Sequence, residues 1–138
     1  MAWGFRSIPL PSLGCRLRGL GLRCGCRARE QEKSLWLHRA LLAYLLVDPD
    51  QAIAYAREQV LRWKRVHRSD GMTGRWLQLW DDVLDRGVES VVDTLTSRST
   101  HALELRANSP FAGLLPDDVR RDVLAAFGRW WRQQGRAA

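Results

Sequence analysis

The feature that most constrains this chain is the helical period of its apolar residues from residue 30 onward. Apolar side chains recur there at spacings of three and four. No segment alternates apolar and polar residues with the period of two that a half-buried strand requires. The pattern therefore predicts an all-α fold, an antiparallel helical bundle of about five to six helices with short connections.

Local signals place the boundaries of these helices. Pro49 disfavours helix at the residue before it, and Asp48 is suited to cap a second helix that has Pro49 at its first position. Thr73 is expected to cap the third helix, and Gly87 to end it. Pro116 opens the last one. The expected helices are 30–47, 49–68, 74–86, 88–97, a segment from Ser99 or Thr100 to just before Asn108, and 116–134. The apolar stripe predicted for the first of them consists of Leu35, His38, Leu41, Leu42, Leu45 and Leu46.

Residues 1–29 have a different composition from the rest of the chain. Prolines 9 and 11 and several glycines interrupt every periodic pattern, and the segment holds six arginines and no acidic residue. The remaining chain has 16 basic residues against 15 acidic ones, so most of the net charge of +7 belongs to this segment. We expect a disordered basic tail over 1–29 and one helical domain over 30–134. The tail could also be a basic arm that contacts phosphates.

Cysteine usage and hydropathy bound the environment of the protein. The three cysteines, Cys15, Cys24 and Cys26, all lie in the tail. An odd number makes a closed disulfide framework unexpected, and the Cys24–Cys26 spacing is too short for a zinc knuckle. The absence of cysteine elsewhere fits a reducing cytoplasm. The cysteine spacing therefore predicts no bound metal. No stretch is apolar and long enough for a membrane span, so we expect a cytoplasmic protein.

The residue types that carry chemistry do not combine into a catalytic pattern. His38, His67 and His101 lie on separate predicted helices, and none has a second histidine four residues away. His38 and His67 are expected to be buried and hydrogen-bonded. Glycine-rich phosphate loops and a serine nucleophile elbow are also missing from the sequence. We therefore expect a protein that is not an enzyme and holds no cofactor.

One candidate binding surface is the basic face of the second predicted helix. Clustered cations are what phosphate contacts require, which favours nucleic acid as a partner. The same face could instead pair with the acids at 81–85 of the third helix. The candidate nucleic-acid-binding residues are Arg57, Arg62, Lys64, Arg65 and Arg68.

The other candidate surface is aromatic and would bind a protein partner. Trp130 and Trp131 are adjacent on one helix, so both can be in the core only if the apolar face is wide. Either both are partly buried, or one is an exposed anchor of the kind enriched at binding hot spots. Phe111 lies in a loop flanked by proline and glycine. It either plugs the core against Trp130 or Trp131, or is itself an exposed anchor.

A set of short segments spread over the helical region carries a resemblance to known proteins. These segments are 35–40, 48–50, Arg62-Trp63, 76–85, Gly87-Val88, Arg98-Ser99, Ala102, Leu105-Arg106 and 109–113. They resemble a family of small actinobacterial helical proteins. In that family the helical region follows an N-terminal helix-turn-helix domain, in antitoxin-like transcriptional regulators of toxin–antitoxin pairs. The resemblance implies that this chain is the partner-binding or dimerising half of such a regulator, with a cognate toxin or a second copy as its partner, and it supplies no catalytic residue. Residues 1–29 depart from the family because they do not form a helix-turn-helix.

Overall fold

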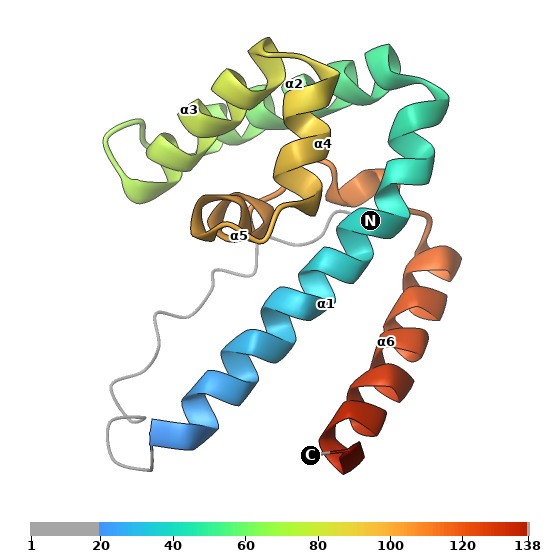
Figure 1. Cartoon of the computed structure of the whole chain (residues 1–138). Coiled ribbons are helices and arrows are strands. Elements are labelled where there is room, and N and C mark those ends of the chain that lie inside the picture. The colour runs from blue at the N-terminus through green and yellow to red at the C-terminus, as the bar shows by residue number, and fades with distance from the viewer. Residues whose placement is uncertain (1–19, 138) are drawn as a thin grey trace.

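Six α-helices and one short 3-10 helix make up the computed structural model, which describes residues 20–137, and their side chains from 27 to 135. The described chain contains no strand, which confirms the all-α prediction (Figure 1). The elements are α1 (Leu20–Val47), α2 (Pro49–Val66), α3 (Met72–Asp85), α4 (Val88–Thr96), α5 (Thr100–Ala107), η2 (Ala112–Leu114) and α6 (Asp117–Ala137).

The long helix α1 organises the other elements. It packs against α4 and α5 on one side, and α6 packs against another side of it. α6 runs back beside α1, so the start of α1 and the end of α6 lie at the same end of the molecule (Figure 1). We call this antiparallel pair the α1/α6 arm. α2 and α3 form a second antiparallel pair, joined by the turn at 67–71.

The first helix begins at Leu20 and not at Glu30, which corrects the predicted start of that helix. Gly21 and Gly25 each cost a helix about 1 kcal/mol relative to alanine, and this cost led the sequence interpretation to start the first helix too late. Packing of α1 against α6 supplies the stabilisation that local propensity does not show. The remainder of the predicted tail, residues 1–19, lies outside the described residues.

The helix caps explain most of the other boundaries. The Asp48 carboxylate accepts a hydrogen bond from the Gln51 amide at 3.1 Å, and Ser99 does the same for Ala102 at 3.2 Å. The predicted cap at Asp48 is therefore confirmed, and of the two starts left open for the fifth helix the structure has Thr100, with Ser99 as its cap. The prediction for Thr73 was wrong, because α3 already begins at Met72. Gly87 follows the end of α3 with φ of +90°, a backbone conformation that side-chain-bearing residues rarely adopt.

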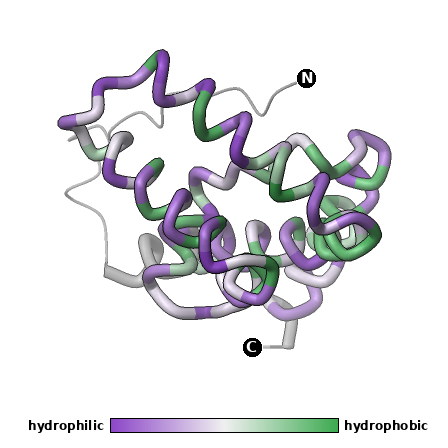
Figure 2. Tube along the Cα trace, turned by 90° about the horizontal axis from the view of Figure 1, so that it is seen from above, coloured by the Kyte–Doolittle hydropathy of each residue, from purple (hydrophilic) through white to green (hydrophobic). Residues whose placement is uncertain are grey.

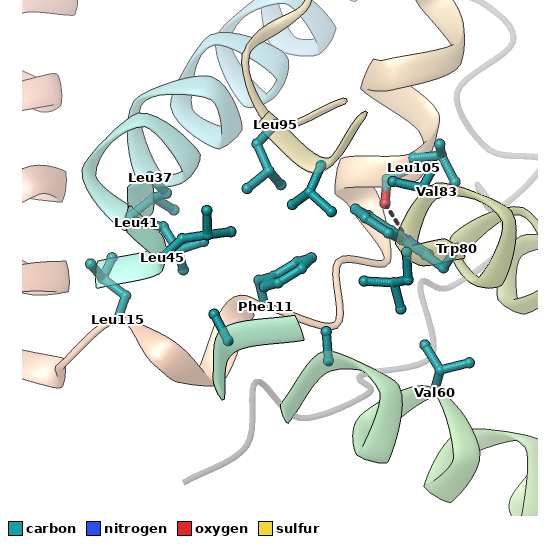
Figure 3. Close-up of a cluster of buried hydrophobic side chains, with 14 of the residues drawn as sticks. Leu37, Leu41, Leu45, Val60, Trp80, Val83, Leu95, Leu105, Phe111 and Leu115 are labelled. Atoms are coloured by element: carbon teal, nitrogen blue, oxygen red, sulfur yellow. Dashed lines mark hydrogen bonds between the residues drawn. The ribbon is translucent and has the colours of Figure 1, made fainter. Parts of the chain in front are cut away.

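The core lies where α1 meets α2–α5. Hydrophobic and hydrophilic stretches alternate along the helices (Figure 2). In the core, the Phe111 ring lies between the buried leucines of α1 and the ring of Trp80 from α3 (Figure 3). The Trp80 indole N–H donates to the Leu105 carbonyl at 3.2 Å, so this large ring is buried without an unsatisfied donor. Leu35, Leu41 and Leu45 are buried as predicted, whereas Leu46, at the end of α1, is 57% exposed.

Candidate protein-interaction surface

Four aromatic rings cluster on the α1/α6 arm. Trp36 of α1 lies 5.6 Å from Phe127 and 5.3 Å from Trp130 of α6, measured between ring centroids. Trp131 lies 5.8 Å from Phe127 and 6.0 Å from Trp130. Phe127 is buried at the centre of the cluster, whereas the three tryptophans around it are each half-buried. We call these three tryptophans and Phe127 the aromatic surface.

The aromatic surface follows from the wide apolar face of α6. Trp130 and Trp131 point about 100° apart on the helix, and among the described elements only α1 packs extensively against α6. One covering helix cannot enclose both rings, so the interpretation that both are partly buried is confirmed. Arg29 adds a cation–π contact, with its guanidinium carbon 6.0 Å from the Phe127 ring centroid.

Trp36 and Arg29 were missed by sequence reasoning. Both lie on the side of α1 opposite to the predicted stripe that contains His38 and Leu45. α1 is apolar toward two neighbours, α4–α5 on one side and α6 on the other. Trp36 lies outside the predicted apolar stripe of its helix, and a large apolar residue in such a position indicates that a second helix covers that side.

Phe111 does not belong to the aromatic surface, and the proposal that it is a partner anchor was wrong. Its side chain is fully buried, with its ring centroid 5.8 Å from that of Trp80 in an edge-to-face arrangement (Figure 3). The plug interpretation is confirmed, although its expected partners, Trp130 and Trp131, were also wrong. The loop folds inward beneath α1, and Gly113 passes so close to the Tyr55 hydroxyl that a Cβ atom there would collide with it.

The basic face of α2 is exposed, as predicted, but it is largely neutralised by acids. Arg57 donates to Asp85 at 2.8 Å, Lys64 pairs with Asp81, and Arg68 contacts Asp70 at 3.1 Å. α3 runs antiparallel to α2, and this brings Asp81 and Asp85 alongside the basic residues. The alternative that this face pairs with the third helix is thus confirmed for Arg57 and Lys64.

Two of the predicted nucleic-acid contacts remain available to solvent. Arg62 and Arg65 are exposed and form no ion pair with any residue whose side chain is described. A hollow of about 730 Å³ lies nearby, beside the α2–α3 turn. Charges of both signs line it, from Lys64, Arg75 and Asp70, so it offers no uniform attraction to a phosphate.

A group of buried and half-buried polar side chains joins α1 to α4 and α5. Arg106 is only 3% exposed and donates to the carbonyls of Thr94 at 2.8 Å and Ser97 at 2.6 Å. These carbonyls end α4 and have no helical partner, so the guanidinium satisfies them and complements the negative end of the helix dipole. Burial nevertheless lowers the pKa of Arg106. The role of Arg106 in joining α5 to α4 had no signal in the sequence.

Glu32 and Arg98 form the exposed rim of this polar group. Arg98 donates two hydrogen bonds to the Glu32 carboxylate, at 2.7 and 3.0 Å, across 66 residues of sequence. The bidentate bond lowers the pKa of Glu32 and raises that of Arg98. The pair connects α1 to the turn between α4 and α5.

His38 is buried and hydrogen-bonded, as predicted. Its Nδ1–H donates to the Ser34 carbonyl at 2.7 Å, one helical turn earlier. Its Nε2 has no partner among the described side chains. Burial lowers the pKa of the ring to about 4, with the nearby positive charge of Arg106 acting in the same direction. His38 is therefore neutral at pH 7 and contributes to packing.

The described residues hold neither a metal-like cluster nor a membrane helix. No three histidine, cysteine or acidic side chains among them come close enough to hold a metal ion. None of the helices in this part of the chain combines the length and the apolar character needed to cross a bilayer. The chain was also compared with protein families, curated proteins and solved structures, and none of them matches it.

Proposed function

We propose that this chain is a non-enzymatic interaction module that binds a protein partner through the aromatic surface of the α1/α6 arm. The observation that carries the proposal is the partial burial of Trp36, Trp130 and Trp131 around the buried ring of Phe127. Tryptophan is enriched at binding hot spots because it buries a large area at a small entropic cost. A cluster fixed by mutual ring contacts loses little further freedom when a partner covers it.

The resemblance described above suggests the class of partner. An antitoxin-like or regulator-associated protein of the cytoplasm would bind a cognate toxin or another regulator subunit. Nucleic acid is less well supported as a partner, because three of the five basic residues proposed for it are paired with carboxylates. Only Arg62 and Arg65 of the candidate set remain free to release counterions from a phosphate backbone.

A capture experiment tests the proposal. Tagged wild-type chain is used to retain proteins from an extract of its source cells, beside Trp131→Ala and the control Leu61→Ala. Leu61 is 55% exposed on α2, so its truncation removes a surface apolar group away from the arm. We expect a partner retained by wild type and by the control, and lost or weakened by about 2 kcal/mol with Trp131→Ala, the size of a hot-spot effect.

Two results would count against this function. A partner that binds Trp131→Ala as tightly as wild type would place the binding surface elsewhere. Retention of nucleic acid that falls steeply with salt and is lost in the double variant Arg62→Ala, Arg65→Ala would favour the nucleic-acid alternative. Circular dichroism of each variant shows whether the helical fold is intact.

A further inference from the structure

One edge of α6 carries a stripe of apolar residues that is not fully covered by the rest of the protein. Val119, Val123, Ala126 and Trp130 follow one another at spacings of four, three and four, which places them along one side of the helix. All four are half-buried, and Val119 and Val123 also pack against the hydrophobic core. The edge is therefore apolar, continuous and only partly covered.

Two opposite charges flank this edge. Asp122 and Arg129 lie beside the apolar stripe, both exposed. They are seven residues apart on one helix, which corresponds to roughly 10 Å along the axis and is too far for an ion pair between them. Neither forms an ion pair with another residue in the part of the chain whose side chains are described.

A two-fold axis through the middle of this edge would pair those charges. In an antiparallel packing of two copies of α6 centred between residues 125 and 126, Asp122 of each copy faces Arg129 of the other. Symmetry makes every such contact occur twice. The small side chain of Ala126 lies at the crossing point, where it allows the close approach of two helix axes.

We propose that the partner of this edge is a second copy of the chain, bound through an antiparallel α6–α6 contact. The inference rests on the proposed function, since it names a partner for part of the aromatic surface, the side that carries Trp130. Asp122 and Arg129 are exposed and about two turns apart on the same side of α6, so a single antiparallel arrangement of two copies pairs both charges of each copy. A foreign acidic or basic partner would be matched by charges of a single sign.

Charge reversal tests the contact, with molecular mass in solution as the readout. By sedimentation equilibrium we expect the wild-type chain of 15.8 kDa to reach twice that mass as its concentration rises. Asp122→Arg and Arg129→Asp should each weaken the dimer about tenfold or more, because each replaces two attractive pairs by two repulsive ones. Asp117→Arg is the control, since it makes the same charge change at an exposed residue that lies about 140° around α6 from Asp122.

Mixing the two variants gives the sharper result. Asp122→Arg and Arg129→Asp chains should form a heterodimer about as tight as the wild-type dimer, because every reversed charge then meets its opposite. The double variant with both changes in one chain should dimerise again by itself. Both substituted residues are exposed, so circular dichroism should show an unchanged fold.

The outcomes separate this inference from the proposed function. A chain that stays at 15.8 kDa at every concentration, or charge variants that are not rescued by mixing, would overturn the α6–α6 contact. If partner capture in the same preparation still depended on Trp131, the proposed function would stand without it. Conversely, a dimer with charge-swap rescue that captures no other protein would support self-pairing alone.

Discussion

At the residue scale, His38 couples the stability of the protein to pH. Its ordinary pKa is 6.5, and burial lowers the pKa in the folded protein to about 4. Between these two values the unfolded chain binds a proton at His38 that the folded chain does not. Unfolding therefore becomes more favourable as the pH falls through this window.

The expected effect of His38 is a loss of about 3 kcal/mol in the free energy of unfolding between pH 6.5 and 4, from 1.36 kcal/mol for each unit of pKa. Urea unfolding at a series of pH values measures it. His38→Leu has no ring to protonate, so its stability should fall less over the same range. Equal slopes for the two proteins would show that other groups, such as Glu32, account for the acid sensitivity.

For Phe111, the prediction that the ring is buried in the core was correct, but the prediction of the ring it contacts was wrong. A single aromatic ring in a loop rich in proline and glycine indicates a side chain that ties the loop down. The choice of partner depends on how α3 and the loop meet, which no spacing along the sequence encodes. The structure places Trp80 there, 31 residues earlier in the chain.

Truncating this ring tests the plug directly. Phe111→Ala should lower the free energy of unfolding by roughly 3–5 kcal/mol, the range for removing a buried phenylalanine. Denaturant unfolding gives the value, and Phe111→Leu should cost less because it retains most of the apolar volume. A loss well below 1 kcal/mol for the alanine variant would mean that the loop does not anchor the core.

At the element scale, the helix ends marked by a proline or a side-chain cap were predictable because they depend on a few adjacent residues. Asp48 and Pro49 alone define the junction of α1 and α2, and Ser99 defines the start of α5. The start of α3 was missed because its N-cap is Gly71, which forms no side-chain cap bond. Gly74 also lies so close to the Ser69 carbonyl that a Cβ atom would collide with it. That approach depends on the shape of the turn, which local preferences do not reveal.

The Asp48 cap gives a matched comparison of two acids in one helix. Asp48→Ala removes the acceptor of the Gln51 amide and should destabilise the protein by about 0.5–2 kcal/mol. Asp50→Ala, two residues later, removes only a favourable charge near the helix dipole, so it should cost about 0.3–1 kcal/mol. Thermal unfolding of both variants measures the difference. Equal losses would indicate that the charge of Asp48 matters and its cap bond does not.

At the scale of the whole molecule, the sequence predicted the fold class and most helices but not their arrangement. The helical period of the apolar residues indicates that a helix has an apolar side, and Leu35 and Leu41 identified that side of α1 correctly. The period does not indicate which other helix packs against this apolar side. The aromatic surface arises only when α6 returns along α1, which brings Trp36 to residues some 90 positions away.

Truncation of the N-terminus tests how much of α1 the fold requires. The sequence composition predicts that residues 1–29 are dispensable, whereas the structure begins α1 at Leu20 and places Arg29 over Phe127. Deleting 1–19 should leave the melting temperature nearly unchanged. Deleting 1–29 should in addition remove the first turns of α1 and the cation–π contact, at a cost on the order of 1 kcal/mol.

Two further variants separate the causes of that loss. Arg29→Ala in the chain that begins at residue 20 removes the cation and keeps the helix, so its melting temperature should lie between those of the two truncated chains. Calorimetry of the three proteins under one condition measures the differences. If the chain lacking 1–29 melts at the same temperature as the one lacking 1–19, the first ten residues of α1 add nothing to the stability of the arm, and the helical domain starts at residue 30 after all. If deleting 1–19 alone is costly, the arm depends on residues that precede α1.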